Sequence, residues 1–180
     1  IKHISIILAF RVMLSSPVAA QDYDKGLAAY INEDYATAFK EWKPLADQGL
    51  AIAQLNLGVM YTNGWGVIQD YKEAVKWFKL AAEQEDAKAQ HSLGVMYTNG
   101  WGTIQDYKEA VKWYKLAAEQ GYAKAQSNLG LMYVLGQGVI QDYAMAHLWL
   151  NIGATNGDEL GGTNRAVSYT HLTLPTTGVV

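Results

Sequence analysis

The sequence predicts an all-α fold, an α-solenoid built from helix-turn-helix repeats. The first observation is repetition: residues 57–66 (LGVMYTNGWG) recur as residues 93–102, and residues 68–77 (IQDYKEAVKW) recur as residues 104–113. The second is a looser third copy at the same offset of 36 residues, in which Gly130 and Asp142 match Gly94 and Asp106. The third is the spacing of apolar residues at steps of three and four, which is typical of amphipathic helices. A repeat of this length indicates stacked helical units.

The repeats divide the chain into a series of units. We assign full units to residues 50–85, 86–121 and 122–157. Upstream, Asp34 and Tyr35 match Asp70 and Tyr71, which indicates a partial unit over residues 22–49. The predicted solenoid covers residues 21–162. Because no unit can bury its apolar side alone, stacking between neighbours must supply the core.

Each full unit is predicted to hold two helices. The first helices cover roughly residues 51–62, 88–98 and 124–134, and the glycines that follow are expected to end them, because glycine tolerates the left-handed backbone of a helix end. The second helices are expected to begin at Asp70, Asp106 and Asp142, since aspartate is a good N-cap. Glu73 and Glu109 stand three residues later and suggest a capping box.

Glycine also recurs inside the first helices, at Gly58, Gly94 and Gly130. A glycine there costs about 1 kcal/mol against alanine, so the repetition needs a reason. We expect two helices to approach closely at these positions, with Ala81 and Ala82 or their copies on the facing helix.

Residues 1–20 resemble a secretory signal peptide. Lys2 and His3 precede an apolar run, and small residues at positions 18–20 come before a polar switch at Gln21. Arg11 interrupts the apolar run, so the alternative is a helical or disordered N-terminal extension. Cleavage would make the protein periplasmic or secreted, with no stable membrane span in the mature chain.

Residues 163–180 depart from the repeat pattern. They are rich in threonine, follow no repeat phase and are similar to translated sequencing-adaptor sequence. We expect an irregular, non-native tail.

Composition excludes several kinds of site. The chain contains no cysteine, which excludes disulfides, thiolate metal sites and a cysteine nucleophile. The net charge of −3 gives no reason to expect a nucleic acid as partner. No nucleophile elbow, zinc-protease motif or phosphate loop is present, and none of the histidines stands at metal-ligand spacing: His3, His91, His147 and His171. We therefore predict a protein that is not an enzyme and needs no metal or cofactor.

The repeated pattern A-x-A-Q-x-x-L-G-x-M-Y-x-x-G-x-G-V-x-x-D-Y-x-x-A-x-x-W-x-x-x-A-A resembles the Sel-one-like repeat, a relative of the tetratricopeptide repeat. It covers residues 51–82, 87–118 and 123–154. The resemblance implies a right-handed, tetratricopeptide-like superhelix and an adaptor that brings proteins together, often in bacterial envelopes. A cysteine-rich branch of the family is linked to β-lactam binding or hydrolysis, but a chain without cysteine matches that branch poorly.

We expect a protein or peptide partner to bind the concave surface, which the first helices line in such solenoids. The alternative is a solvated surface without affinity. The residues expected to face the partner are Leu55, Val59, Thr62, His91, Val95, Thr98, Ser127, Leu131 and Val134, with Asn56, Ser92 and Asn128 beside them.

Two further features allow either a functional or a structural interpretation. Trp65 and Trp101 each lie between two glycines in a loop, where they would stack on a glycan such as a peptidoglycan fragment, or fold back onto the adjacent unit. A ridge of lysines would offer an anionic contact or form an ordinary solvated face, and it comprises Lys72, Lys76, Lys79, Lys108, Lys112 and Lys115.

Overall fold

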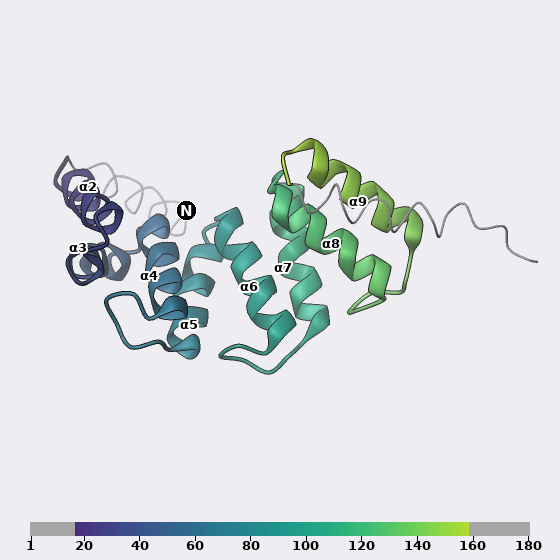
Figure 1. Ribbon diagram of the computed structural model, residues 1–180, viewed down its shortest axis with the longest axis horizontal. Helices are drawn as coiled ribbons and strands as arrows, with labels where there is room; N and C mark the ends of the chain where they lie inside the picture. Colours follow the sequence, from purple (N-terminus) through teal and green to yellow (C-terminus); the bar gives the residue numbers. More distant parts are fainter. Residues whose placement is uncertain (1–16, 159–180) are drawn as a thin grey trace, which may run out of the picture. The chain divides into compact units, whose positions relative to one another are not determined.

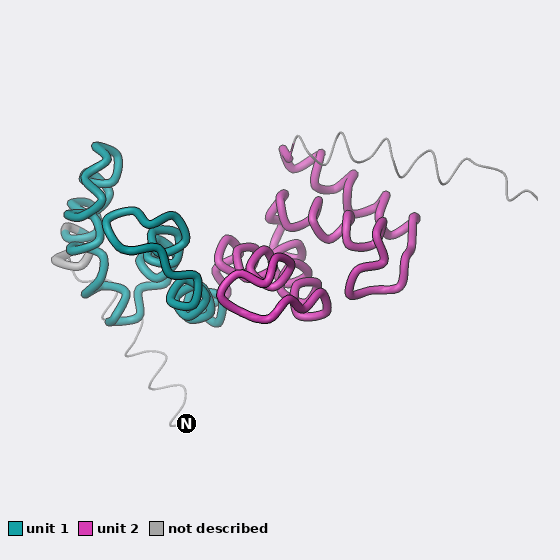
Figure 2. The backbone as a smooth tube through the Cα atoms, turned by 60° about the horizontal axis from the view of Figure 1, so that its bottom comes forward, with its two compact units in different colours: residues 1–84 teal, residues 85–180 magenta. Residues whose placement is uncertain are grey.

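The computed structural model describes residues 17–158, which contain helices and no strand. The chain divides between Gln84 and Glu85 into two compact units, drawn in separate colours in Figure 2. Unit 1 contains α2 (Pro17–Ile31), α3 (Tyr35–Asp47), α4 (Ala51–Asn63) and α5 (Tyr71–Ala82). Unit 2 contains α6 (Ala87–Asn99), α7 (Tyr107–Glu119), α8 (Ala123–Leu135) and α9 (Tyr143–Thr155) (Figure 1). Within each unit every helix packs against the next one along the chain, which confirms the predicted all-α class of stacked helix pairs.

The first helices of the full repeats lie within one residue of their predicted limits. They end at Gly64, Gly100 and Gly136, whose φ angles of 71°, 70° and 66° are left-handed as expected. The upstream helix α2 begins at Pro17 and therefore includes residues 18–20, where the sequence predicted a cleavage site. Residues 1–16 of the predicted signal peptide and the tail 163–180 lie outside the described residues.

The second helices begin at aspartate caps, as predicted. The side chain of Asp70 accepts from the backbone N–H groups of Lys72 and Glu73 at 2.9 and 3.1 Å, and the third repeat forms the same cap. The predicted capping box does not form, because the backbone N–H of Asp70 already donates to the carbonyl of Tyr61 at 2.9 Å. Glu73 pairs with Lys76 instead.

The glycines inside the first helices each face one large side chain of the second helix. A Cβ atom added at Gly130 would lie 2.7 Å from Cγ of Leu150. At Gly58 and Gly94 the added atom would overlap the aromatic rings of Phe78 and Tyr114. The expected close approach of two helices is seen at Gly130, where the added atom would also lie 3.1 Å from the carbonyl oxygen of Ala146. The expectation that Ala81, Ala82 or their copies lie opposite these glycines is wrong, because the glycine makes room for a ring or a leucine that fills the core.

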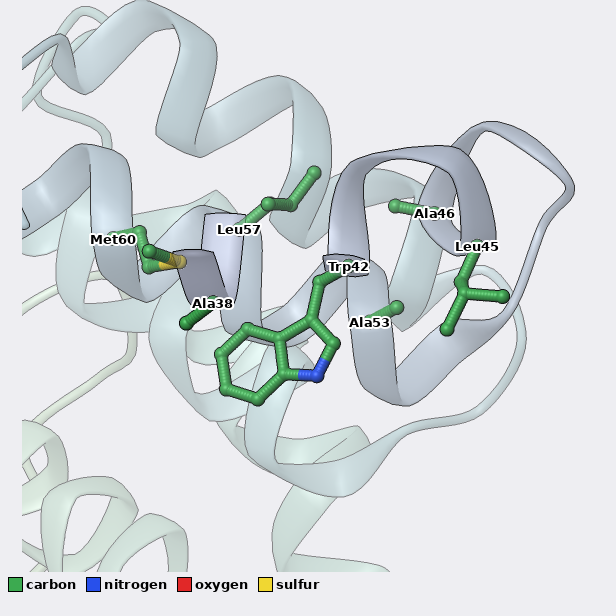
Figure 3. Close-up of a cluster of buried hydrophobic side chains, with 7 residues drawn as sticks. All are labelled: Ala38, Trp42, Leu45, Ala46, Ala53, Leu57 and Met60. Carbon is green, nitrogen blue, oxygen red and sulfur yellow. The ribbon is translucent and has the colours of Figure 1, made fainter. Parts of the chain in front are cut away.

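The core of unit 1 gathers around the indole of Trp42, which is 1% exposed. Its Nε1 donates to the carbonyl of Tyr23 at 3.2 Å, so the buried polar atom is paired. The cluster drawn in Figure 3 joins residues of α3 and α4, namely Ala38, Trp42, Leu45, Ala46, Ala53, Leu57 and Met60. Unit 2 has an equivalent cluster around Tyr114.

A buried glutamine links three consecutive helices in each unit. In unit 1, Nε2 of Gln54 donates to the carbonyl of Ala46 at 3.0 Å, and Nε2 of Gln84 donates to Oε1 of Gln54 at 2.8 Å. In unit 2, Gln126 donates to the carbonyl of Ala118 at 3.0 Å and accepts from Asn156 at 2.9 Å. These bonds tie α3 to α4 and α7 to α8, and each also reaches the residues that follow the next helix.

Candidate partner-binding surface

The first helices of unit 2 present a mixed apolar and polar surface. His91, Val95 and Thr98 follow steps of four and three along α6, and all are partly exposed. Leu131 and Val134 on α8 are also partly exposed. We call the set His91, Val95, Thr98, Leu131 and Val134 the α6–α8 surface. Since Val95 also packs against the core of unit 2, its exposed part is held in place.

Polar side chains stabilise this surface. Nδ2 of Asn128 donates to Nε2 of His91 at 3.0 Å, and this bond links α8 to α6. The hydroxyl groups of Thr98 and Tyr114 are hydrogen-bonded at 3.2 Å, which links α6 to α7. The His91 ring lies 5.7 Å from the Tyr114 ring and 5.2 Å from the Tyr122 ring. These contacts hold the side chains in place before a partner binds, which lowers the entropic cost of binding.

The His91 ring is mostly enclosed by protein, and this position determines its charge. The pKa of His91 is lowered from 6.5 to about 4, chiefly by burial and also by the positive charge of Lys124, while Asp158 partly opposes the shift. An amide nitrogen can only donate, so the Nε2 atom that faces Asn128 must carry no proton. The surface is thus uncharged at His91 near neutral pH.

Two of the residues that the sequence predicted to face a partner are buried. Leu55 is 8% exposed, and Ser127 is 3% exposed with its hydroxyl packed against Gly153. The expectation that these two side chains face away from the core does not hold. In unit 1, Val59 and Thr62 remain partly exposed on α4.

The flanking asparagines form hydrogen bonds between helices, which the sequence did not indicate. In unit 1, Nδ2 of Asn56 donates to the hydroxyl of Tyr23 at 3.3 Å and links α4 to α2, as Asn128 links α8 to α6. Ser92, at the corresponding position of α6, donates to the carbonyl of Lys88 in its own helix at 2.8 Å.

The loop tryptophan of unit 1 folds back onto the preceding helix pair. The ring of Trp65 stacks on Tyr35 at 5.1 Å with an interplanar angle of 10°, and it meets Tyr30 edge-on at 5.8 Å. One face of its indole is therefore occupied by protein, which favours the packing interpretation over sugar stacking. Trp101 in unit 2 is 42% exposed.

An exposed isoleucine recurs in the loop between the two helices of every full repeat, and sequence reasoning missed it. Ile68, Ile104 and Ile140 are 91%, 86% and 90% exposed. The loop around each one is held by a glutamine; Gln105, for example, donates to the carbonyl of Thr98 at 2.8 Å. The repeated I-Q-D triplet was the available signal.

Three of the six lysines of the ridge form ion pairs with glutamates. Lys76 pairs with Glu73, and Lys112 pairs with Glu109 at 3.2 Å. Lys115 lies 3.8 Å from Glu119. These exposed pairs, each within one helix, are those of an ordinary solvated face.

Within residues 17–158, no group of histidine, aspartate and glutamate side chains is arranged to hold a metal ion. A search of the same residues finds no helix whose length and apolar character would let it cross a membrane.

The consecutive helix pairs, with their aspartate caps and glycine loops, define a helical-repeat protein. The family model described as the Sel1 repeat matches residues 51–86, 87–122 and 123–158, and the chain belongs to this family. These limits lie one residue downstream of the units assigned from the sequence.

Solved structures of bacterial proteins share the fold. The chain is 42% identical to c5321, a protective antigen of uropathogenic Escherichia coli with an SLR fold, at a TM-score of 0.80 over 90% of this chain and 36% of that one. It is 34% identical to a Sel1 repeat protein from Oxalobacter formigenes, at a TM-score of 0.77 over 82% of this chain and 59% of that one. Cysteine-rich protein B of Helicobacter pylori is 18% identical with a TM-score of 0.58, a likeness of fold alone. The chain spans only part of the first two proteins, and no curated protein matches it.

Proposed function

We propose that this chain is an exported interaction scaffold that holds a protein or peptide partner on the α6–α8 surface. Sel1-repeat proteins are protein-interaction scaffolds and generally not enzymes. The observation that carries the proposal is the recurrence of partly exposed side chains at the same positions of two first helices, with Val95 and Thr98 on α6 matched by Leu131 and Val134 on α8.

The chemistry of this surface suits a peptide or a partner helix. Val95 and Leu131 offer small apolar contacts, while the neighbouring hydroxyl and imidazole groups provide hydrogen-bonding atoms. Because Asn128 and Tyr114 already hold those polar groups, a partner would meet a surface that needs little rearrangement.

The binding test compares three chains. Wild type, a Val95→Glu/Leu131→Glu double variant and a Leu116→Glu variant are used to capture partners from a bacterial envelope extract. Leu116 is 39% exposed on α7 and is the matched control. We expect the double variant to lose the partner that wild type and Leu116→Glu retain, with helix content by circular dichroism equal in all three. Retention by the double variant would refute the α6–α8 surface as the binding site.

Export is tested separately. The pattern of residues 1–20 supports cleavage near Gln21. We expect the full chain, expressed in a Gram-negative bacterium, to appear in the periplasmic fraction with a new N-terminus near Gln21. A protein that keeps Lys2 and stays in the cytoplasm would refute the export part of the proposal alone.

A further inference from the structure

The outer side of α9 is apolar where the corresponding side of α7 is charged. At the repeat offset of 36 residues, Met145 of α9 stands in place of Glu109 of α7, and Leu148 stands in place of Lys112. Ile152 corresponds to Leu116, which is already apolar. Leu148 is 48% exposed, and Met145 and Ile152 are partly exposed. We call Met145, Leu148 and Ile152 the α9 strip.

The charge of the whole third repeat is unusually low. Lys124 and Asp142 are the only lysine, arginine, aspartate or glutamate residues between positions 122 and 157. Neither lies on the α9 strip, because Lys124 is on α8 and Asp142 is the helix cap. The strip can therefore meet a copy of itself without like-charge repulsion.

A further repeat stacked after α9 would not cover this strip. The helix α7 shows this, because the next repeat already packs against it through α8 within unit 2. The Lys112 side chain of α7, at the position of Leu148, nevertheless remains 61% exposed. A molecule that covers the strip would therefore come from outside the stack of helices.

We propose that the α9 strip pairs with the α9 strip of a second copy of this chain. Met145, Leu148 and Ile152 are separated by three and four residues, the spacing at which two helices pack along a common seam. Leu148 lies near the middle of the strip, so an antiparallel pair related by a two-fold axis places Leu148 against its copy and Met145 against Ile152. Such a contact is self-complementary, as a symmetric dimer requires.

A cysteine scan tests the geometry directly, because the natural sequence contains no cysteine. In the Leu148→Cys variant of the full chain, the two-fold axis brings the new thiols within disulfide reach, about 7 Å between Cα atoms. We expect mild oxidation to give a covalent dimer in good yield. The matched control, Lys112→Cys, occupies the corresponding position of α7, where the lysine side chain is 61% exposed, and is expected to stay mostly monomeric. Equal crosslinking of the two variants would overturn the proposal.

Reversible association is measured by light scattering and sedimentation over about a hundredfold range of protein concentration. We expect wild type to approach twice the monomer mass and Leu148→Lys to remain monomeric. Leu148→Lys should fold, since lysine occupies the same place at Lys76 and Lys112. Ile104→Lys removes an exposed isoleucine elsewhere and should leave the dimer intact. A wild-type chain that stays monomeric throughout, or a dimer unaffected by Leu148→Lys, would refute the α9 contact while leaving the proposed scaffold function untouched.

Discussion

The side-chain amide of Asn128 donates to Nε2 of His91 at 3.0 Å and joins two first helices of unit 2. The bond requires a neutral imidazole, because the amide nitrogen only donates hydrogen bonds and Nε2 must therefore be the acceptor. Burial keeps the imidazole neutral by lowering the pKa of His91 to about 4.

We expect this histidine to make unit 2 sensitive to acid. The unfolded chain binds a proton at His91 below about pH 6.5, whereas the folded chain binds one only near pH 4, so stability present above pH 6.5 is lost as the pH falls toward 4. The loss at about pH 4.5 is about 2.5 kcal/mol. Urea unfolding at neutral and acidic pH measures it.

His91→Leu is the control for this prediction, because Leu55 occupies the matching place in unit 1. Carboxyl groups titrate alike in wild type and in the variant. The difference between their free energies of unfolding as a function of pH therefore reports His91 alone. The variant should lose less stability in acid than wild type, and identical pH profiles would contradict the assignment.

Gly94→Ala should destabilise the protein although alanine is the better helix former. The gain in helix propensity is about 1 kcal/mol, but the added Cβ overlaps the ring of buried Tyr114, and overpacking of this kind costs about 1–3 kcal/mol. In a Tyr114→Ala background the same substitution meets no ring and should cost less. A double-mutant cycle by chemical denaturation gives the coupling, and a coupling of zero would show that the ring is not the obstacle.

Gln126→Ala should cost about 2 kcal/mol, because it removes two hydrogen bonds that are worth about 1 kcal/mol each. One is donated to the carbonyl of Ala118, which keeps its bond from the backbone N–H of Gly121, and the other is accepted from Asn156. Gln141→Ala is the matched control. Gln141 is exposed and donates a single bond to the carbonyl of Val134, so its loss should cost less than about 1 kcal/mol. Thermal unfolding compares the two, and equal losses would argue against a special role for the buried glutamine.

Glu85→Gly should stabilise the protein by about 1 kcal/mol, since a left-handed backbone is unfavourable for a residue with a Cβ atom. Glu85 has a φ of 65°, while Gly121 and Gly157 occupy the same turn of later repeats with φ of 87° and 96°. The reverse change, Gly121→Glu, should destabilise by a similar amount. Because nothing lies within 4 Å of a Cβ atom at Gly121, its effect would report backbone strain alone. A destabilised Glu85→Gly variant in chemical denaturation would contradict this account.

The sequence by itself determined the helix pairs, their limits and the family of the protein. These features are local: Asp70 caps the helix that follows it, Gly100 ends the helix that precedes it, and the 36-residue offset repeats both signals. Backbone propensity and capping act over a few residues, so they can be read from neighbouring letters.

Only the tertiary structure decided which side chains face a partner. Ser127 and Leu131 lie one turn apart on α8, yet the first is buried against Gly153 and the second is partly exposed. In the same way, the reason for Gly94 is the ring of Tyr114, twenty residues away along the chain. Burial depends on atoms that other helices bring to the site, and the spacing of residues along a single helix carries no information about those atoms.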